Sequence, residues 1–402
     1  MDEKYIKLLI NNCTDLKNNK ILFISYKKEI KEFINKLVNY AKNMGVEDIY
    51  LDEEDILLTH EIFKNIKEEE IKESTYFDKS IWDEYAKKKA SFLIFETEYP
   101  GLMDDINSEI IGLVGKRKQE TRKLFRKMEE RCELPWCIAA YPGEMWAQKL
   151  FGNNSYNKLK DYIFKICMLD KENPDEEWQK LINKNSRIID KLNKLNIEKL
   201  HYKNSLGTDL ELYLPNNYQY SSAKDSICIV NMPSYEVFTS PIYNKTEGIV
   251  YASKPLVYNG GLIDKFWIKF KNGKVIDYDA KIGKDLLKEI IETDNNSCYL
   301  GEAALVEKDS PINKLNINFN TTLIDENASC HLALGAGFPE CIKDGLNMST
   351  TELLNNGINS SKQHVDFMIG TDDLEITGYT KDNKEIKIFE QGKFSKEILW
   401  KD

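Results

Sequence analysis

The stretch ILFISY, from Ile21 to Tyr26, decides the fold class. It is apolar and rich in β-favouring residues, and apolar residues then recur from Glu29 to Met44 at the spacing of an amphipathic helix. Gly45 can end that helix, and a second strand-like run, DIYLD, follows from residue 48. A strand, a helix and a strand in this order predict a βαβ unit. We therefore expect a mostly parallel sheet in the N-terminal part.

Further elements of the same kind follow this unit. SFLIFETEYPG, Ser91 to Gly101, has the character of a buried strand that ends in a turn. Residues 107–128 and 178–195 combine apolar residues at helical spacing with many charged ones, which predicts helices on the surface. No GxGxxG motif follows the first strand, so the sequence does not support dinucleotide binding.

The residue pattern changes from about His201 onward, where turn dipeptides separate short runs of β-favouring residues. KFWIKFKNGKVIDYDA alternates apolar and polar residues around Asn272-Gly273, which predicts a β-hairpin. We therefore expect an α/β protein of two domains with a boundary near residue 195. Residues 1–195 would form an N-terminal α/β domain with a mostly parallel sheet, and 196–402 a C-terminal mixed α/β domain.

Composition excludes several functional classes. The 402 residues are 42% hydrophobic and 30% charged with a net charge of -10, which would repel a nucleic-acid backbone. No stretch approaches ~18 consecutive apolar residues, so no membrane span is expected. The eight cysteines form no CxxC pair, and the N-terminus has no cationic stretch before its short apolar run. These features predict a soluble, cytoplasmic protein with reduced thiols.

Two of the four histidines have neighbours that can take part in chemistry. His364 and Asp366 lie two residues apart in the β-favouring run HVDFMIG and therefore point to the same face. A histidine hydrogen-bonded to a neighbouring aspartate would explain this pattern equally well. His331 lies five residues after Glu326, and the two can share a site only if the chain turns between them. Otherwise Glu326 would be an ordinary exposed acid in the first turn of a helix that Asp325 caps.

Two further acids have mostly small or apolar neighbours. Glu302 lies in YLGEAALV, which should be buried, and a buried carboxylate requires a partner or a metal. Glu236 lies between two prolines in NMPSYEVFTSP, where it could equally face solvent from a loop. Cys330, beside His331, is interpreted as a structural thiol. His60 and His201 have no acidic or metal-ligand context in the sequence and are interpreted as surface residues.

The candidate residues together indicate a metal site. Two imidazoles with several carboxylates suit Zn²⁺, Co²⁺ or Mn²⁺. Glu236, Glu302, Glu326 and Asp366 would carry four negative charges, and one divalent cation would leave about two of them uncompensated. A site for two divalent cations is therefore the better electrostatic interpretation.

At these residues the chain resembles the thermophilic metalloprotease family of aminopeptidases. The similar stretches occur in family order between about residues 200 and 372: GTDLELYLP, NMPSYEVFTSP, ASKPLVYNGGLI, YLGEAALVEKDSPI, LIDENASCHLALG and HVDFMIG. The resemblance implies two metal ions in the C-terminal domain. Cobalt, zinc or magnesium supports the activity of different members. It also implies peptide substrates cleaved at the N-terminus, and a homodimer that partly encloses the site. The implied ligands are Glu236, Glu302, His331, His364 and Asp366, with Glu326 at a further acidic position.

The chain departs from the family pattern at two positions. Phe338 stands where the family usually carries a tyrosine, and Tyr235-Glu236 replaces the usual pair of glutamates. If the missing hydroxyl holds an oxyanion, its loss would cost on the order of 3 kcal/mol. One hypothesis is that Tyr235 substitutes for it. The alternative function is metal or peptide binding with reduced or lost turnover. Glu302 and Glu326 are the two candidates for the general base, and the sequence does not choose between them.

Overall fold

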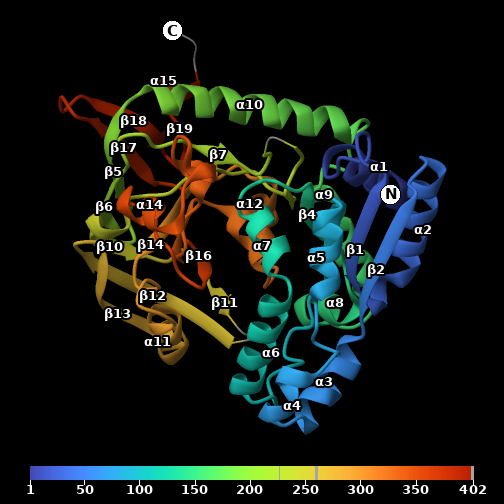
Figure 1. Cartoon of the computed structure of the whole chain (residues 1–402). Helices are drawn as coiled ribbons and strands as arrows, with labels where there is room; N and C mark the ends of the chain where they lie inside the picture. The colour runs from blue at the N-terminus through green and yellow to red at the C-terminus, as the bar shows by residue number, and fades with distance from the viewer. Residues whose placement is uncertain (226, 259–260, 400–402) are drawn as a thin grey trace. The chain divides into compact units, whose positions relative to one another are not determined.

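The computed structural model describes residues 1–225, 227–258 and 261–399 (Figure 1). Internal contacts divide the chain into two compact units: Met1–Trp178 with Lys224–Pro233, and Gln179–Ala223 with Ser234–Asp402. The change between units falls within the long helix α10 (Pro174–Lys194). Among the described residues, none of the helices has both the length and the apolar composition that a membrane-spanning segment requires.

The first unit contains a five-stranded sheet in the order β2-β1-β3-β4-β8, and every pair of neighbours is parallel. Its strands are β1 (Ile21–Lys27), β2 (Asp48–Glu54), β3 (Ser91–Glu96), β4 (Trp136–Ala140) and β8 (Asn231–Met232). Helix α2 (Lys31–Asn43) connects β1 to β2, and Gly45 follows it with a positive φ of 81°. The predicted βαβ unit and parallel sheet are therefore confirmed, because the helix ends where a residue without a Cβ can take that conformation.

The other helices of this unit are α1 (Asp2–Asn12), α3 (Ile56–Asn65), α4 (Glu68–Glu73), α5 (Ser80–Lys87), α6 (Ser108–Thr121), α7 (Lys123–Glu129), α8 (Glu144–Phe151) and α9 (Tyr156–Ile166). The surface helix expected over 107–128 is two helices, because Arg122 has non-helical angles between them. Helix α7 also buries Phe125, whose ring lies 4.7 Å from that of Phe92. An aromatic cluster with Phe23 and Trp82 thus holds α5 and α7 against the sheet.

The second unit contains a nine-stranded antiparallel sheet in the order β11-β12-β10-β6-β5-β17-β18-β19, with β13 paired to β12. Its strands are β5 (Ile197–Lys203), β6 (Asp209–Tyr213), β10 (Glu247–Tyr251), β11 (Leu256–Tyr258), β12 (Gly261–Lys271), β13 (Lys274–Ile282), β17 (Glu375–Thr380), β18 (Glu385–Glu390) and β19 (Lys393–Phe394). Asn272 and Gly273 connect β12 to β13 with positive φ values of 49° and 76°. Both residues accept this conformation, and the predicted hairpin is confirmed.

A five-stranded antiparallel sheet, in the order β16-β15-β14-β9-β7, completes the second unit. Its strands are β7 (Ser221–Ser222), β9 (Val237–Thr239), β14 (Leu300–Leu305), β15 (His331–Gly335) and β16 (His364–Met368). The remaining helices of the unit are α11 (Lys284–Glu292), α12 (Pro311–Leu315), α13 (Thr322–Asp325), α14 (Thr350–Asn355) and α15 (Lys396–Leu399). Parallel strands in the first unit and antiparallel strands in the second confirm the mixed α/β fold.

The two faces of this smaller sheet have different roles. Leu332, Leu334, Val365 and Phe367 point to one face and belong to the main hydrophobic core. Their neighbours in the sequence point to the other face, because side chains alternate along a strand. That second face carries the candidate site residues of β15 and β16.

A β-bulge at Gly301 sets the direction of Glu302. The pairing of β14 with β15 shifts between Leu300 and Glu302, so Leu300 enters the core while Glu302 points to the other face. A Cβ on Gly301 would lie 2.0 Å from the backbone oxygen of Ala336. Only glycine fits this close approach of two strands.

Candidate metal centre

Three neighbouring strands place acidic and imidazole side chains on one face of the sheet. Glu302 of β14 lies opposite Ala333 of β15, and Ala333 lies opposite Asp366 of β16. His364 is opposite Gly335 in the same way. Because alanine and glycine occupy the middle strand at these positions, the functional groups on either side can converge without a bulky side chain between them.

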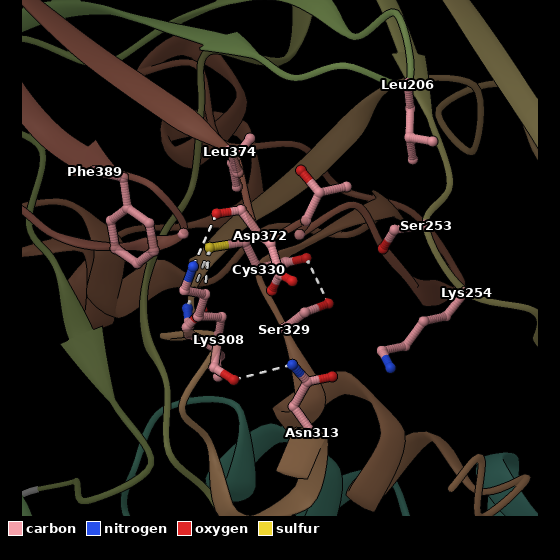
Figure 2. A pocket seen from close by; sticks show the side chains of 14 residues that line it. Leu206, Ser253, Lys254, Lys308, Asn313, Ser329, Cys330, Asp372, Leu374 and Phe389 are labelled. Carbon is pink, nitrogen blue, oxygen red and sulfur yellow. Dashed lines mark hydrogen bonds between the residues drawn. The ribbon is translucent and has the colours of Figure 1, made fainter. Parts of the chain in front are cut away.

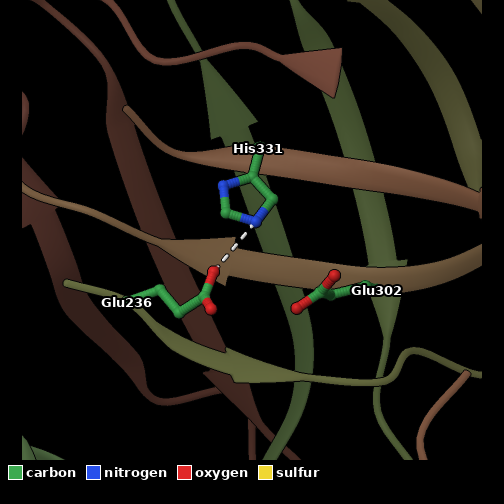
Figure 3. Close-up of side chains that lie close together, drawn as sticks. All are labelled: Glu236, Glu302 and His331. Carbon is green, nitrogen blue, oxygen red and sulfur yellow. Dashed lines mark ion pairs between the residues drawn. The ribbon is translucent and has the colours of Figure 1, made fainter. Parts of the chain in front are cut away.

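The described residues contain two groups of three potential ligand atoms that lie within 4.8 Å of one another. Glu236, Glu302 and His331 form one group (Figure 3), and Glu302, His364 and Asp366 form the other. Figure 3 shows the carboxylates of Glu236 and Glu302 directed toward the imidazole of His331. Glu302 belongs to both groups, which is the arrangement that a carboxylate shared by two cations requires.

Both histidines are oriented by backbone carbonyl groups. Nδ1 of His331 lies 3.2 Å from the carbonyl oxygen of Ser329, and Nδ1 of His364 lies 2.8 Å from that of Ala336. Nδ1–H donation to these carbonyls leaves Nε2 as the basic nitrogen of each ring. Nε2 of His331 lies 3.1 Å from Glu236, and Nε2 of His364 lies 3.0 Å from Glu302. In the metal-free protein Nε2 of each ring therefore carries a proton toward its carboxylate, and loss of that proton would make the same nitrogen available to a metal.

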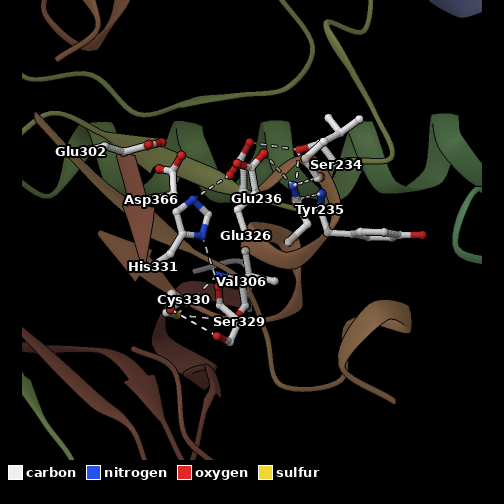
Figure 4. A network of polar contacts seen from close by, with 12 residues as sticks. Ser234, Tyr235, Glu236, Glu302, Val306, Glu326, Ser329, Cys330, His331 and Asp366 are labelled. Atoms are coloured by element: carbon white, nitrogen blue, oxygen red, sulfur yellow. Dashed lines mark hydrogen bonds and ion pairs between the residues drawn. The ribbon is translucent and has the colours of Figure 1, made fainter. Parts of the chain in front are cut away.

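Residues that the sequence interpretation missed hold two of the acids in place (Figure 4). The hydroxyl of Ser234 donates to Glu236 over 3.1 Å, and Nδ2 of Asn327 donates to Glu326 over 3.3 Å. Oδ1 of Asn327 accepts the backbone N–H of Tyr235 over 2.6 Å, which ties the two segments together. The only sequence signal for these supporting roles is that Ser234 and Asn327 are polar residues within largely buried segments.

Glu326 lies on a short 3-10 helix, η3 (Glu326–Ala328), which provides the turn that a shared site with His331 requires. It is buried, with 8% of its surface exposed, and is not the exposed first-turn acid of the alternative interpretation. Burial and the charges of Asp366, Glu236 and Glu302 raise the pKa of Glu326 well above its usual range. Glu326 belongs to neither group of potential ligands among the described residues.

Three further site residues, Glu302, His331 and Asp366, have shifted pKa values. Burial, with the charge of Asp366, raises the pKa of Glu302 to about 7. Burial lowers the pKa of His331, but the hydrogen bond and charge of Glu236 outweigh it and raise the value to about 9. Burial raises the pKa of Asp366, but His364 outweighs it and holds the value at about 2. The metal-free cluster thus retains protons that compensate its negative charge.

The donor set fits divalent cations. Oδ1 of Asp366 is buried and takes part in no hydrogen bond among the described residues, although Nε2 of His364 lies 3.2 Å away. In the metal-free protein the imidazole of His364 supplies the positive charge that this buried oxygen requires, and a divalent cation would supply it when bound. Carboxylate oxygens and neutral imidazole nitrogens are ligands for zinc, cobalt and manganese. The six predicted residues are therefore close together in space, with Glu302 central to the cluster.

Phe338 lies beside the site. Its ring centroid is 4.8 Å from that of His364 and 5.2 Å from that of Phe238, so a hydroxyl is absent from this edge of the cluster. Figure 4 shows the ring of Tyr235 extending away from the carboxylates. The hypothesis that the Tyr235 hydroxyl substitutes for the family tyrosine is therefore not supported by its direction.

The other two histidines do have acidic partners, which corrects the interpretation from the sequence. Nε2 of His60 lies 2.7 Å from Asp105, and Nε2 of His201 lies 2.6 Å from Asp209. The first pair joins residues that are 45 apart in the sequence and the second joins adjacent strands, so neither follows from neighbouring residues, although Glu61 also lies 3.6 Å from Nδ1 of His60. Cys330 is buried and packs in the core, as expected of a structural thiol.

Comparisons with known proteins agree with this site. The family model described as thermophilic metalloprotease (M29) matches residues 2–394. Aminopeptidase 2 of Geobacillus stearothermophilus is 33% identical over 98% of each chain, and aminopeptidase AmpS of Bacillus subtilis is 32% identical over 97% of each. The structure of wild-type AmpT from Thermus thermophilus matches with a TM-score of 0.88 at 25% identity, covering 98% of both chains. The chain therefore belongs to the thermophilic metalloprotease (M29) family, as its motifs predict.

Proposed function

We propose that this chain is an aminopeptidase that hydrolyses the N-terminal peptide bond of peptides with two divalent cations. The observation that carries the proposal is Glu302, which belongs to both groups of potential ligands. Glu236 and His331 would complete one position, and His364 with Asp366 the other. The family and its named relatives support a metal-dependent peptidase. Zinc, cobalt, manganese and magnesium all remain candidates for the metal.

Divalent cations bound at such a site polarise a scissile carbonyl and lower the pKa of water. The chain itself must then move the proton. We assign this role to Glu326, because Glu302 is engaged by both groups whereas Glu326 belongs to neither. Glu326 accepts a proton from the attacking water and donates it to the leaving nitrogen as the C–N bond breaks. Asn327 holds the Glu326 carboxylate in position through its side-chain amide.

The cluster also favours substrates with a free N-terminus. The free α-amino group of a substrate would be held by a bound cation or by one of the site carboxylates, those of Glu236, Glu302, Glu326 and Asp366, which are buried together. An acetylated N-terminus can neither bind a cation nor carry a positive charge. We therefore expect exopeptidase action, and a blocked peptide should not be cleaved.

The test is hydrolysis of leucyl-p-nitroanilide and of a dipeptide panel before and after chelation. We expect hydrolysis to disappear with chelator and to return with Co²⁺, Zn²⁺, Mn²⁺ or Mg²⁺, while N-acetyl-leucyl-p-nitroanilide stays intact. Phe338 favours a second candidate, a protein that binds metal and peptide with reduced or lost turnover. Stoichiometric metal without hydrolysis of any dipeptide would establish that alternative. The homodimer and the cytoplasmic location remain predictions.

A further inference from the structure

The five side chains that would hold the cations are exposed to different extents. The side chain of His364 is 24% exposed, whereas those of Glu236 and Asp366 are 7% exposed. The side chains of Glu302 and His331 are 5% and 1% exposed. A substrate has to approach from a side on which solvent reaches the ligands. The accessible edge of the metal centre is therefore the edge at His364.

Phe338 borders this edge and is itself half-buried. Its ring centroid lies 4.8 Å from that of His364 and 5.2 Å from that of Phe238. The backbone N–H of Phe338 donates to the hydroxyl of Ser240 over 2.9 Å. Two ring contacts and a backbone hydrogen bond hold Phe338 in place. The accessible part of its ring is therefore a fixed apolar surface beside the most exposed ligand.

A small cavity at Asp366 offers little room for a substrate side chain. It measures about 10 Å³, and Val257, Thr321 and Met368 line it together with Asp366. A space of this size holds about one water molecule. A side chain larger than a methyl group therefore does not fit there.

The larger cavity of the second unit, of about 270 Å³, lies on the other side of the sheet (Figure 2). The residues described in its wall include none of the six residues of the metal centre. Cys330, Leu374 and Phe389 line it and belong to the main hydrophobic core. Side chains alternate along β15, so this core lies on the face opposite His331. The larger cavity therefore does not receive a side chain from the metal centre.

We propose that Phe338 is a specificity-determining residue, whose ring receives the side chain of the substrate's N-terminal residue and favours apolar side chains. The inference rests on the proposed function, which holds the amino group and carbonyl of that residue at the metal centre. The side chain then extends past the exposed edge at His364 and packs against the ring of Phe338. A leucine side chain covers the ring, whereas alanine is too short to do so and lysine has to keep its charge in water. Leucine is therefore preferred to both.

Calorimetry with amino-acid hydroxamates tests the inference on the metal-loaded full chain, because it measures binding without turnover. We expect the wild type to bind leucine hydroxamate at least about tenfold more tightly than alanine hydroxamate or lysine hydroxamate. Phe338→Ala removes the ring and should reduce this preference to less than about threefold. Phe338→Tyr keeps the ring and should keep the preference. Phe151→Ala is the matched control, because it removes a half-buried ring of α8 in the first unit, and its preference should equal that of the wild type.

Three results would overturn the inference: equal affinities of the wild type for the three hydroxamates, an undiminished preference in Phe338→Ala, or tightest binding of the lysine derivative. Metal analysis and circular dichroism melting of each variant separate a lost subsite from lost metal and from lost folding. Hydrolysis of leucyl-, alanyl- and lysyl-p-nitroanilide, measured in parallel, separates the inference from the proposed function. Equal hydrolysis of the three substrates overturns the subsite and leaves the aminopeptidase proposal intact. A preference for leucine hydroxamate without any hydrolysis supports the subsite and contradicts the aminopeptidase proposal.

Discussion

Replacing Glu326 by glutamine removes the proposed proton acceptor with little change in shape. A general base contributes about 10²- to 10⁴-fold to a rate, so we expect kcat to fall by about 10³-fold, or about 4 kcal/mol of transition-state stabilisation. Metal content should stay at the wild-type value, because Glu326 belongs to neither group of potential ligands among the described residues. The assay is steady-state hydrolysis of leucyl-p-nitroanilide alongside metal analysis of the same sample.

The same substitution has a second, opposite effect on stability. The folded-state pKa of Glu326 is raised, so its ionised form destabilises the metal-free protein above the pKa of an unfolded glutamate. Glutamine carries no charge, and metal-free Glu326→Gln should therefore melt at a higher temperature than wild type near neutral pH. Glu289→Gln, an exposed change on α11, should alter neither property. A Glu326→Gln enzyme with full metal content and more than about a tenth of wild-type kcat would refute the assignment of the base.

Three further predictions concern the metal ligands and their neighbour. Glu302→Gln should weaken the binding of both cations by at least about 100-fold, because both groups share Glu302. Glu236→Gln should weaken the binding of only one cation. Calorimetric metal titrations that show equal effects of the two substitutions would contradict this prediction. The pKa of about 9 keeps a proton on His331 at neutral pH, and metal binding must displace that proton. Metal affinity should therefore rise with pH up to about 9. A pH-independent affinity would contradict the assignment of His331 as a metal ligand. Phe338→Tyr adds a hydroxyl beside His364 and should raise kcat by up to about 100-fold; an unchanged kcat in steady-state assays would show that this hydroxyl has no role.

Local patterns in the sequence were sufficient to predict much of the fold. The strand at Ile21–Lys27 and the helix after it follow from the spacing of apolar residues, and Asn272-Gly273 determines the hairpin by its backbone preferences. The sequence did not indicate that Asn231–Met232 pairs with β4, because strand partners distant in sequence depend on the whole fold. The split between α6 and α7 at Arg122 also lacked a glycine or proline signal.

The candidate site was predicted in part for the same reason. His364 and Asp366 share a face because side chains alternate along a strand, and their spacing of two residues was enough to predict this. The direction of Glu302 depends on the bulge at Gly301, which an isolated strand pattern does not reveal. The supporting contact of Asn327 joins segments that are 92 residues apart. Such contacts become visible only in three dimensions.

The number of cations per chain tests the central claim most directly. Metal-free protein would be titrated with Co²⁺ or Zn²⁺ while bound metal and leucyl-p-nitroanilide hydrolysis are measured together. The shared position of Glu302 predicts that binding saturates at two ions per chain and that full hydrolysis requires both. Saturation at one ion with full activity, or hydrolysis that persists without metal, would contradict the two-metal account.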